Sequence, residues 1–374
     1  MRRFSAVLQN RRKKPQVRWI SPQRLLLDQQ EIDLDQFRSL LHFQLKSLEL
    51  FFLENLLFGN TLESLGITVD FGALGDKGDR TTHWYSPLLG NIKGNPDSEK
   101  LLKKLVDRGT VLTHNGTELV WNIDVAENWV TDYHEATCRT YCATHITEGS
   151  SGRVTEEAKT QCSNTRTGRR HVFVTQGLNT LCIWSNYWKG TTKSGTFKEI
   201  LRVIPFRVSR LIFILVRVIR PVITLYLARH SVTAENRLAL RTTYSANLWA
   251  TLGSSLTPKQ MYGAIPAFLR SPDGEGNIPL DFKFGARRYR QFVAAVQNKH
   301  IPGSPRYKKA EVEESVGDKQ AGRSGQTSHQ HYAVEESTIA REPAFIEHYI
   351  SYSKKWHKFW RISTEHGKDD QYFV

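Results

Sequence analysis

The most apolar stretch of the chain is VIPFRVSRLIFILVRVIRPVITLYLA, residues 203–228. It contains four arginines: Arg207, Arg210, Arg217 and Arg220. An arginine at the centre of a bilayer costs about 2.5 kcal/mol or more, so four of them disfavour a membrane-spanning helix. We therefore expect a helix buried in a folded protein that does not enter a membrane. Its basic face is expected to contact solvent or phosphate, and the helix is expected to end near Pro221.

Helical patterns dominate the rest of the chain and predict a mostly α fold of the α+β class. The clearest helix starts near Asp33 or Asp35 and stops at Gly59, because acidic caps begin helices and glycine ends them. Asn115 and Gly116 predict the turn of a small hairpin. Further helices are expected at residues 97–108, 125–146, 198–220, 226–251, 258–269 and 285–299, and two strands at residues 170–177 and 179–190.

The order of these segments predicts two domains and a C-terminal piece. A helical domain is expected over residues 1–130, a second α-rich domain with a small hairpin sheet over 131–345, and a helix with a tail over 346–374. Residues 303–326 are rich in Lys, Glu, Gly and Ser, which predicts a flexible connector. The last helical pattern is expected to break at Pro343.

The charge of the chain points to a polyanionic partner. Fifty-two Lys and Arg residues oppose 37 Asp and Glu residues, which leaves a net charge of +15. Such basicity is most often associated with nucleic acid and less often with an anionic membrane surface. The basic segment Arg11 to Lys14 is either a solvated tail or a patch for nuclear import or DNA anchoring.

Four cysteines are too sparse for a disulfide framework: Cys138, Cys142, Cys162 and Cys182. The N-terminal residues are basic but lack the apolar core of a signal peptide, so we expect an intracellular, reducing setting. The spacing of Cys138, Cys142 and His145 is compatible with three zinc ligands on a helix. No second ligand pair follows at a useful distance, so a buried helical face is the favoured interpretation. The sequence therefore predicts neither a metal nor a cofactor.

Three separated blocks carry residues suited to phosphate chemistry. The first, Gly152-Arg153-Val154-Thr155-Glu156, places an arginine just before a helix and a glutamate three residues later. The second, GARRYRQF, carries Arg290, and the third, AGRSGQTSHQHYAV, carries Tyr332 nine residues after Arg323. Lys189 lies between the first two blocks, at the end of the predicted strand pair.

This ordered set resembles the catalytic domain of tyrosine recombinases, and most closely the recombinase-like modules of fungal Crypton-type elements and telomere-linked RecQ-type helicases. The resemblance implies a helical DNA-clamping domain followed by the catalytic domain, duplex DNA as substrate, assembly of several protomers, and a nuclear location. It also implies that Tyr332 attacks a DNA phosphodiester while Arg153 and Arg290 bind the nonbridging oxygens. Lys189 would protonate the leaving oxygen, and Glu156 would orient Arg153.

The chain departs from the pattern of that family at three positions. Arg287 and Gln291 stand where the second block usually has histidines, and Arg323 stands where the third has His or Trp. Arginine donates hydrogen bonds to phosphate but does not act as a base. Two functions therefore stay open: an enzyme that breaks and rejoins DNA, and a decayed module that binds DNA without cutting it. In the non-catalytic interpretation, Tyr332 is a packed aromatic residue. Within the catalytic one, Lys193 or Lys198 lies close enough in sequence to take the place of Lys189.

Overall fold

The computed structural model describes residues 17–90, 95–116, 118–175, 177–185, 200–230, 233–270, 284–301 and 343–365. Within these residues the chain is mostly helical with small antiparallel sheets, which confirms the predicted mostly α class of the α+β type. The predicted connector over residues 303–326 and the basic segment Arg11 to Lys14 lie outside the described residues.

A three-stranded sheet leads into the first long helix. It consists of β1 (Val17–Trp19), β2 (Arg24–Leu27) and β3 (Gln30–Asp33), and it is followed by α2 (Leu34–Phe51) and the π-helix η1 (Phe52–Leu56). The side chain of Asp33 caps α2 by accepting hydrogen bonds from the backbone N–H groups of Asp35 and Gln36. Gly59 has a positive φ of 73° just after the helix, as its predicted stop requires.

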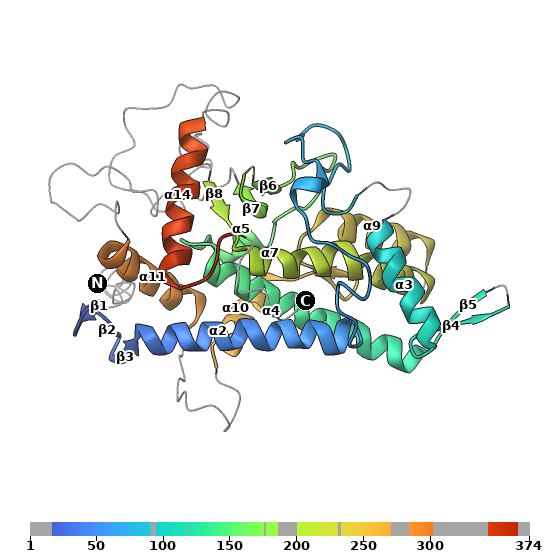
Figure 1. Ribbon diagram of the computed structural model, residues 1–374, viewed down its shortest axis with the longest axis horizontal. Helices are drawn as coiled ribbons and strands as arrows, with labels where there is room; N and C mark the ends of the chain where they lie inside the picture. Colours follow the sequence, from blue (N-terminus) through green and yellow to red (C-terminus); the bar gives the residue numbers. More distant parts are fainter. Residues whose placement is uncertain are drawn as a thin grey trace, which may run out of the picture.

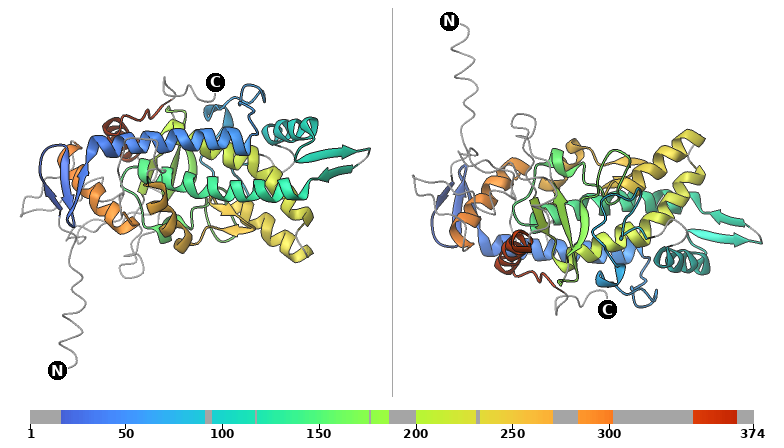
Figure 2. Two further views of the ribbon diagram at one scale, coloured as in Figure 1. Left: turned by 90° about the horizontal axis from the view of Figure 1, so that it is seen from below. Right: turned by 90° about the horizontal axis from the view of Figure 1, so that it is seen from above.

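A short 3₁₀ turn, η2 (Gly72–Leu74), and the helix α3 (Pro96–Arg108) precede the predicted hairpin, which is formed by β4 (Leu112–Asn115) and β5 (Glu118–Trp121). Gly116 takes a φ of 65° in its turn. The helix α4 (Ile123–Thr147) then runs back along α2 (Figure 1). The hairpin projects from one end of an elongated molecule, and β1–β3 lie at the other end (Figures 1 and 2).

A second antiparallel sheet joins β6 (Val172–Thr175), β7 (Thr180–Ser185) and β8 (Ile200–Val203) in that order. The helix α14 (Pro343–Phe359) packs against β8. The prediction of a helix over residues 198–220 is wrong at its start, because β8 is a strand. All four residues of β8 are buried, and periodicity does not distinguish a short apolar run of this kind from a buried helix.

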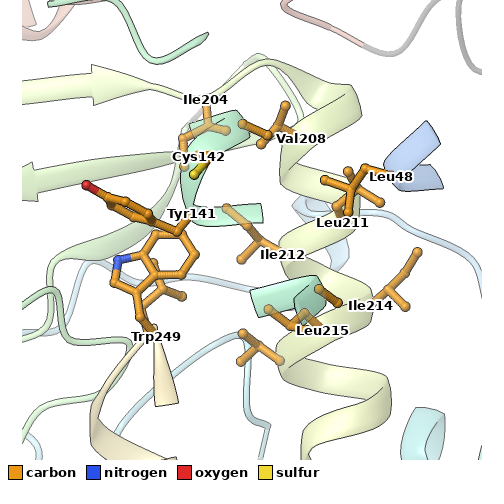
Figure 3. Close-up of a cluster of buried hydrophobic side chains, with 14 of the residues drawn as sticks. Leu48, Tyr141, Cys142, Ile204, Val208, Leu211, Ile212, Ile214, Leu215 and Trp249 are labelled. Atoms are coloured by element: carbon orange, nitrogen blue, oxygen red, sulfur yellow. The ribbon is translucent and has the colours of Figure 1, made fainter. Parts of the chain in front are cut away.

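Residues 206–230 form one continuous helix in three parts: α7 (Phe206–Phe213), the π-helix η3 (Ile214–Ile219) and α8 (Arg220–His230). Figure 3 shows its side chains Val208, Leu211 and Ile212 gathered with Leu48 of α2 and Cys142 of α4. By length and hydropathy the helix qualifies as a candidate membrane span, but 72% of its most apolar window is buried inside the fold. The core helix of a folded protein satisfies the same criteria, so length and hydropathy alone do not indicate that this helix spans a membrane.

The expectation that this helix ends near Pro221 is wrong, and hydrogen bonding explains why. Proline has no N–H group to donate to the carbonyl oxygen four residues earlier, which belongs to Arg217. The side chain of Asn95 supplies the missing donor, because its Nδ2 lies 2.7 Å from Arg217 O. The helix therefore continues to His230.

The expectation that the arginines of this helix contact solvent or phosphate is also wrong. Arg207 Nε lies 2.6 Å from Glu49 Oε1, and Arg210 Nη2 lies 3.3 Å from the same oxygen. Arg217 Nε lies 2.5 Å from Asp97 Oδ2. Buried guanidinium groups need acidic or carbonyl partners, and these carboxylates on α2 and α3 provide them.

Among the residues that the structure describes, Arg220 pairs with no carboxylate, but its guanidinium nitrogens are hydrogen-bonded within the core. Its Nε donates to the hydroxyl oxygen of Tyr133 at 2.9 Å, and its Nη1 donates to the carbonyl oxygens of Tyr244 and Asn247 at 3.2 and 2.9 Å. The side chain is 1% exposed. Arg220 therefore ties α8 to α4 and to the chain after α9 (Ala234–Ala246).

The prediction of one helix over residues 226–251 is wrong in its length. Thr233 caps the new helix α9 by accepting a hydrogen bond from the backbone N–H of Asn236 at 3.2 Å. After α9 the chain forms a small hairpin of β9 (Ala250–Thr251) and β10 (Ser254–Ser255), with Gly253 at a φ of 75° in its turn. The predicted helices near residues 258–269 and 285–299 are present as α10 (Pro258–Phe268) and α11 (Ala286–His300).

One buried apolar cluster extends from Leu25 in β2 to Ile362 after α14. Trp356 on α14 and Trp360 just after it are fully buried in this cluster, and the ring centroids of Trp360 and Phe37 lie 5.1 Å apart. The predicted boundary at residue 130 falls inside α4. The division into units of residues 1–130, 131–345 and 346–374 stays a prediction.

Candidate functional site

Arg153 stands at the N-cap position of α5 (Val154–Glu157), immediately after the loop that follows α4. Its backbone N–H donates to Glu156 Oε2 at 3.4 Å, and its Nη1 lies 3.7 Å from Glu156 Oε1. The spacing of these two residues has a local cause, because a side chain at the third position of a helix reaches back to the cap. Glu156 therefore contacts both the backbone and the guanidinium of Arg153.

Gly152 precedes Arg153 at a point where there is little room for a side chain. A Cβ atom at this position would lie 3.1 Å from Glu157 Oε1 and 3.2 Å from Arg202 Nη2. Both of these neighbours are buried. The first block therefore needs a glycine because two buried charged groups approach the backbone closely.

The helix α11 brings Arg290 toward the same loop. The hydroxyl of Tyr289 donates to the carbonyl oxygen of Ile146 at 2.9 Å, and Gln297 Nε2 donates to Ser150 Oγ. These two bonds join α11 to the end of α4 and to the residues just before Arg153. Arg290 directly follows Tyr289 and is half-buried.

Three arginines act on the carboxylate of Glu156. Burial raises the pKa of Glu156, while the backbone N–H and charge of Arg153 and the charges of Arg202 and Arg290 act in the opposite direction. Arg153 and Arg290, predicted from separate blocks 137 residues apart in sequence (290 − 153), are therefore close enough to influence one group. Guanidinium groups such as those of Arg153 and Arg290 form charge-assisted hydrogen bonds with phosphate oxygens.

A buried hydrogen-bond network lies beside this cluster. Glu157 Oε2 accepts a hydrogen bond from the Tyr141 hydroxyl at 2.9 Å and lies 2.7 Å from His145 Nδ1. Burial acts to raise the pKa of Glu157, but His145 and Arg202 outweigh it and lower that pKa to about 2. Burial and the charge of Glu157 raise the pKa of Glu148 well above its ordinary value. The two neighbouring carboxyl groups therefore differ in acidity, because His145 and Arg202 favour the charged form of Glu157 while burial disfavours that of Glu148.

The ligand atoms of His145, Glu148 and Glu157 lie within 4.8 Å of one another, the spacing of a metal site. Arg202 already supplies positive charge there, because its Nε lies 3.7 Å from Glu148 Oε1 and donates to Ser150 O at 3.0 Å. The group therefore fits a network that holds Arg202 better than it fits a metal centre.

The cysteines of the possible zinc set are not part of that group. Cys142 is fully buried, and burial raises the pKa of its thiol well above the ordinary value. Cys138 Sγ lies 3.8 Å from His134 Nε2. Within the described ranges, no cluster of metal-ligating residues contains either cysteine.

A polar pocket of about 710 Å³ adjoins Glu156. It lies between α5, the loop before β6, the segment around residue 80 and the sheet β6–β8, which Figure 1 shows grouped in the upper middle of the molecule. Its basic lining residues are Arg80, His83, Lys159, Arg166, Arg169, His171 and Arg202, and its acidic ones are Glu148, Glu156 and Glu157.

His171 presents a neutral ring to this pocket. Its Nδ1 lies 2.9 Å from the backbone nitrogen of Gln161 and accepts that N–H, which leaves the ring proton on Nε2. Burial and the nearby charge of Arg80 lower the pKa of His171 to about 4. The pocket therefore contains an imidazole that is uncharged at neutral pH.

The predicted site residues are distributed as follows. Arg153, Glu156 and Arg290 come together, and Arg287 is exposed one helical turn before Arg290 on α11. Lys189, Arg323 and Tyr332 lie outside the described residues. Lys189 falls between Ser185 and Ile200, which pair at the ends of β7 and β8, and Ser185 lines the pocket.

Sequence reasoning missed Arg202, His171, Arg166 and Arg169. Arg202 lies in a strand that was predicted as a helix, so the sequence did not indicate on which face its side chain lies. The segment TRTGRRH, residues 165–171, offered a usable signal, because three arginines around a glycine predict an exposed basic turn.

Comparison with family models, with curated proteins and with solved structures finds no match for this chain.

Proposed function

We propose that this protein binds duplex DNA and breaks and rejoins one strand through Tyr332. The observation that carries the proposal is that Arg153, whose Nη1 lies 3.7 Å from Glu156 Oε1, and Arg290 both act electrostatically on Glu156, which lines a pocket with several basic side chains. Two guanidinium groups match the nonbridging oxygens of a phosphodiester and keep their charge at every physiological pH. The net charge of +15 supports a polyanionic substrate.

The proposed reaction needs neither a metal nor an external energy source. The hydroxyl oxygen of Tyr332 attacks the phosphorus, the bond to the 5′ oxygen breaks, and a 3′-phosphotyrosyl link forms. The proton of Tyr332 leaves to water, and Lys189 gives a proton to the departing 5′ oxygen. Arg153 and Arg290 stabilise the charge that builds up on the phosphate. Attack by a 5′ hydroxyl reverses these steps and rejoins the strand.

The rest of the molecule has roles that follow from the resemblance to recombinases. Residues 1–130 would clamp the duplex against the catalytic unit, and several protomers would assemble on paired sites. The basic segment Arg11 to Lys14 would support import into the nucleus.

Trapping the covalent intermediate tests the proposal. A nicked suicide duplex lets the 5′ fragment diffuse away, so the wild-type protein is expected to accumulate a protein–DNA adduct that survives denaturing electrophoresis. Tyr332→Phe is expected to abolish the adduct, because the nucleophilic oxygen is missing. Tyr262→Phe changes an exposed tyrosine on α10 and should leave the adduct unchanged. An adduct that persists in Tyr332→Phe contradicts the proposed nucleophile.

A second candidate function is DNA binding without cleavage. It is favoured by the replacement of family histidines by Arg287, Gln291 and Arg323, since none of these side chains is a base at neutral pH. Duplex binding that weakens steeply with salt, together with no adduct from the wild-type protein, would establish this alternative.

A further inference from the structure

One wall of the pocket is a tight turn over residues 165–168. The backbone N–H and the hydroxyl of Thr165 both donate to the carbonyl oxygen of Gly168, at 2.7 and 3.1 Å. A Cβ atom at Gly168 would come within 2.5 Å of Gln161 Oε1, so the side chain of Gln161 packs directly against the turn. The hydrogen bonds within the turn and the packed side chain of Gln161 therefore both restrain the backbone of this wall.

A second set of bonds ties this turn to the segment around residue 80. Asn164 Oδ1 accepts from the backbone N–H of Arg170 at 3.0 Å, and Asn164 Nδ2 donates to the carbonyl oxygen of Thr82 at 3.0 Å. The guanidinium of Arg170 is fully buried, lies 2.5 Å from Asp76 Oδ1 and donates to Asp79 O at 2.9 Å. Arg170 is thus a structural residue that fixes the pocket wall.

Arg166 and Arg169 differ from Arg170 in both exposure and bonding. Both are exposed, both line the pocket, and they stand on either side of Gly168. Neither makes an ion pair with any residue in the part of the chain that the structure describes. The wall therefore presents two solvated guanidinium groups on a backbone that is already ordered, which lowers the entropy cost of binding an anion.

Arg153 and Arg290 do not line the pocket themselves, but Glu156, on which both act, does. Glu156, which contacts Arg153, lines the same cavity as Arg166 and Arg169. A volume of about 710 Å³ exceeds what one phosphate group needs and is in the range of sites that accept a whole nucleotide unit. Phosphates follow one another along a DNA strand at about 3.4 Å of rise per residue, so a strand held at one end of the cavity continues into it.

We propose that Arg166 and Arg169 form a second phosphate subsite, which binds DNA backbone phosphates next to the one held by Arg153 and Arg290. This inference rests on the proposed function and extends it, since it assigns part of the path of the DNA strand to residues outside the predicted site. The ligand class is the nucleic acid backbone, because most protein–DNA hydrogen bonds go to phosphate and sugar, and such contacts carry no sequence information directly.

The salt dependence of DNA binding tests the subsite. Each phosphate contact contributes about 0.9 to the slope of log affinity against log salt, so Arg166→Ala/Arg169→Ala is expected to flatten the slope by about 1.8. Fluorescence anisotropy with a labelled duplex, measured at a series of NaCl concentrations, gives this slope. Arg237→Ala/Arg241→Ala is the matched control, because it removes two exposed arginines on α9 that do not line the pocket.

The outcomes separate this inference from the function on which it rests. A slope that flattens in the pocket variant and not in the control supports the subsite, provided that the melting temperature of the pocket variant is unchanged. An unchanged slope, or equal flattening in both variants, overturns it even if the wild-type protein forms the Tyr332 adduct. A wild-type protein that does not bind the duplex overturns the subsite and the proposed function together.

Discussion

Replacing Arg153 or Arg290 with alanine is expected to slow strand cleavage by about 10²–10³-fold. Each variant removes one guanidinium from the pair that would bind the nonbridging oxygens as negative charge develops on them. The rate is measured as single-turnover formation of the covalent adduct on a nicked duplex. Affinity for the duplex is expected to fall far less, because the other basic side chains of this +15 chain would still be available to contact backbone phosphates.

Arg288 provides a neighbouring control on the same helix. It is exposed, and its Nε lies 3.5 Å from Asp28 Oδ2, so Arg288→Ala removes equal charge without touching the cluster at Glu156. Its adduct should form at the wild-type rate. Arg153→Lys keeps the charge but loses the two-pronged geometry and is expected to recover only part of the rate. Wild-type rates in both alanine variants would show that these arginines do not bind the reacting phosphate.

The largest effect on stability is expected from Glu49→Ala. Glu49 is buried on α2, and both of its oxygens bond the guanidinium of Arg207, at 2.6 and 2.5 Å, while Arg210 shares one of them. Removing the carboxylate takes away both of its hydrogen bonds with the buried guanidinium of Arg207 and one contact of the buried Arg210. Breaking a buried pair from one side costs about 3–5 kcal/mol, and we expect the free energy of unfolding to fall by that amount.

Urea unfolding monitored by circular dichroism measures this loss. Glu63→Ala serves as the control, since Glu63 is exposed and its removal should change the free energy of unfolding by less than about 0.5 kcal/mol. If Glu49→Ala were as stable as the control, the contacts among α2, Arg207 and Arg210 would not contribute to the fold as described.

Local signals predicted the elements that depend on neighbouring residues. The cap at Asp33, the stop at Gly59 and the turn at Gly116 each follow from backbone chemistry within a few positions, and the structure has all three. The contact between Arg153 and Glu156 belongs to the same group, because it is made within one helical turn.

Features that depend on distant partners could not be predicted in this way. The partner of Arg207 lies 158 residues away in sequence, and the donor that rescues the helix at Pro221 is Asn95. The arginines were expected to face solvent because their carboxylate partners, Glu49 and Asp97, are far from them in the sequence. Arg202 was missed for a related reason, since its strand is recognised by pairing with β7 and not by its own pattern.

The most direct test of the account is the position of the phosphate in a crystal structure of the complex with the nicked duplex. We expect the nonbridging oxygens of the reacting phosphate to lie about 3 Å from guanidinium nitrogens of both Arg153 and Arg290. A duplex bound on another face of the molecule, with neither guanidinium group in contact with the reacting phosphate, would contradict the account.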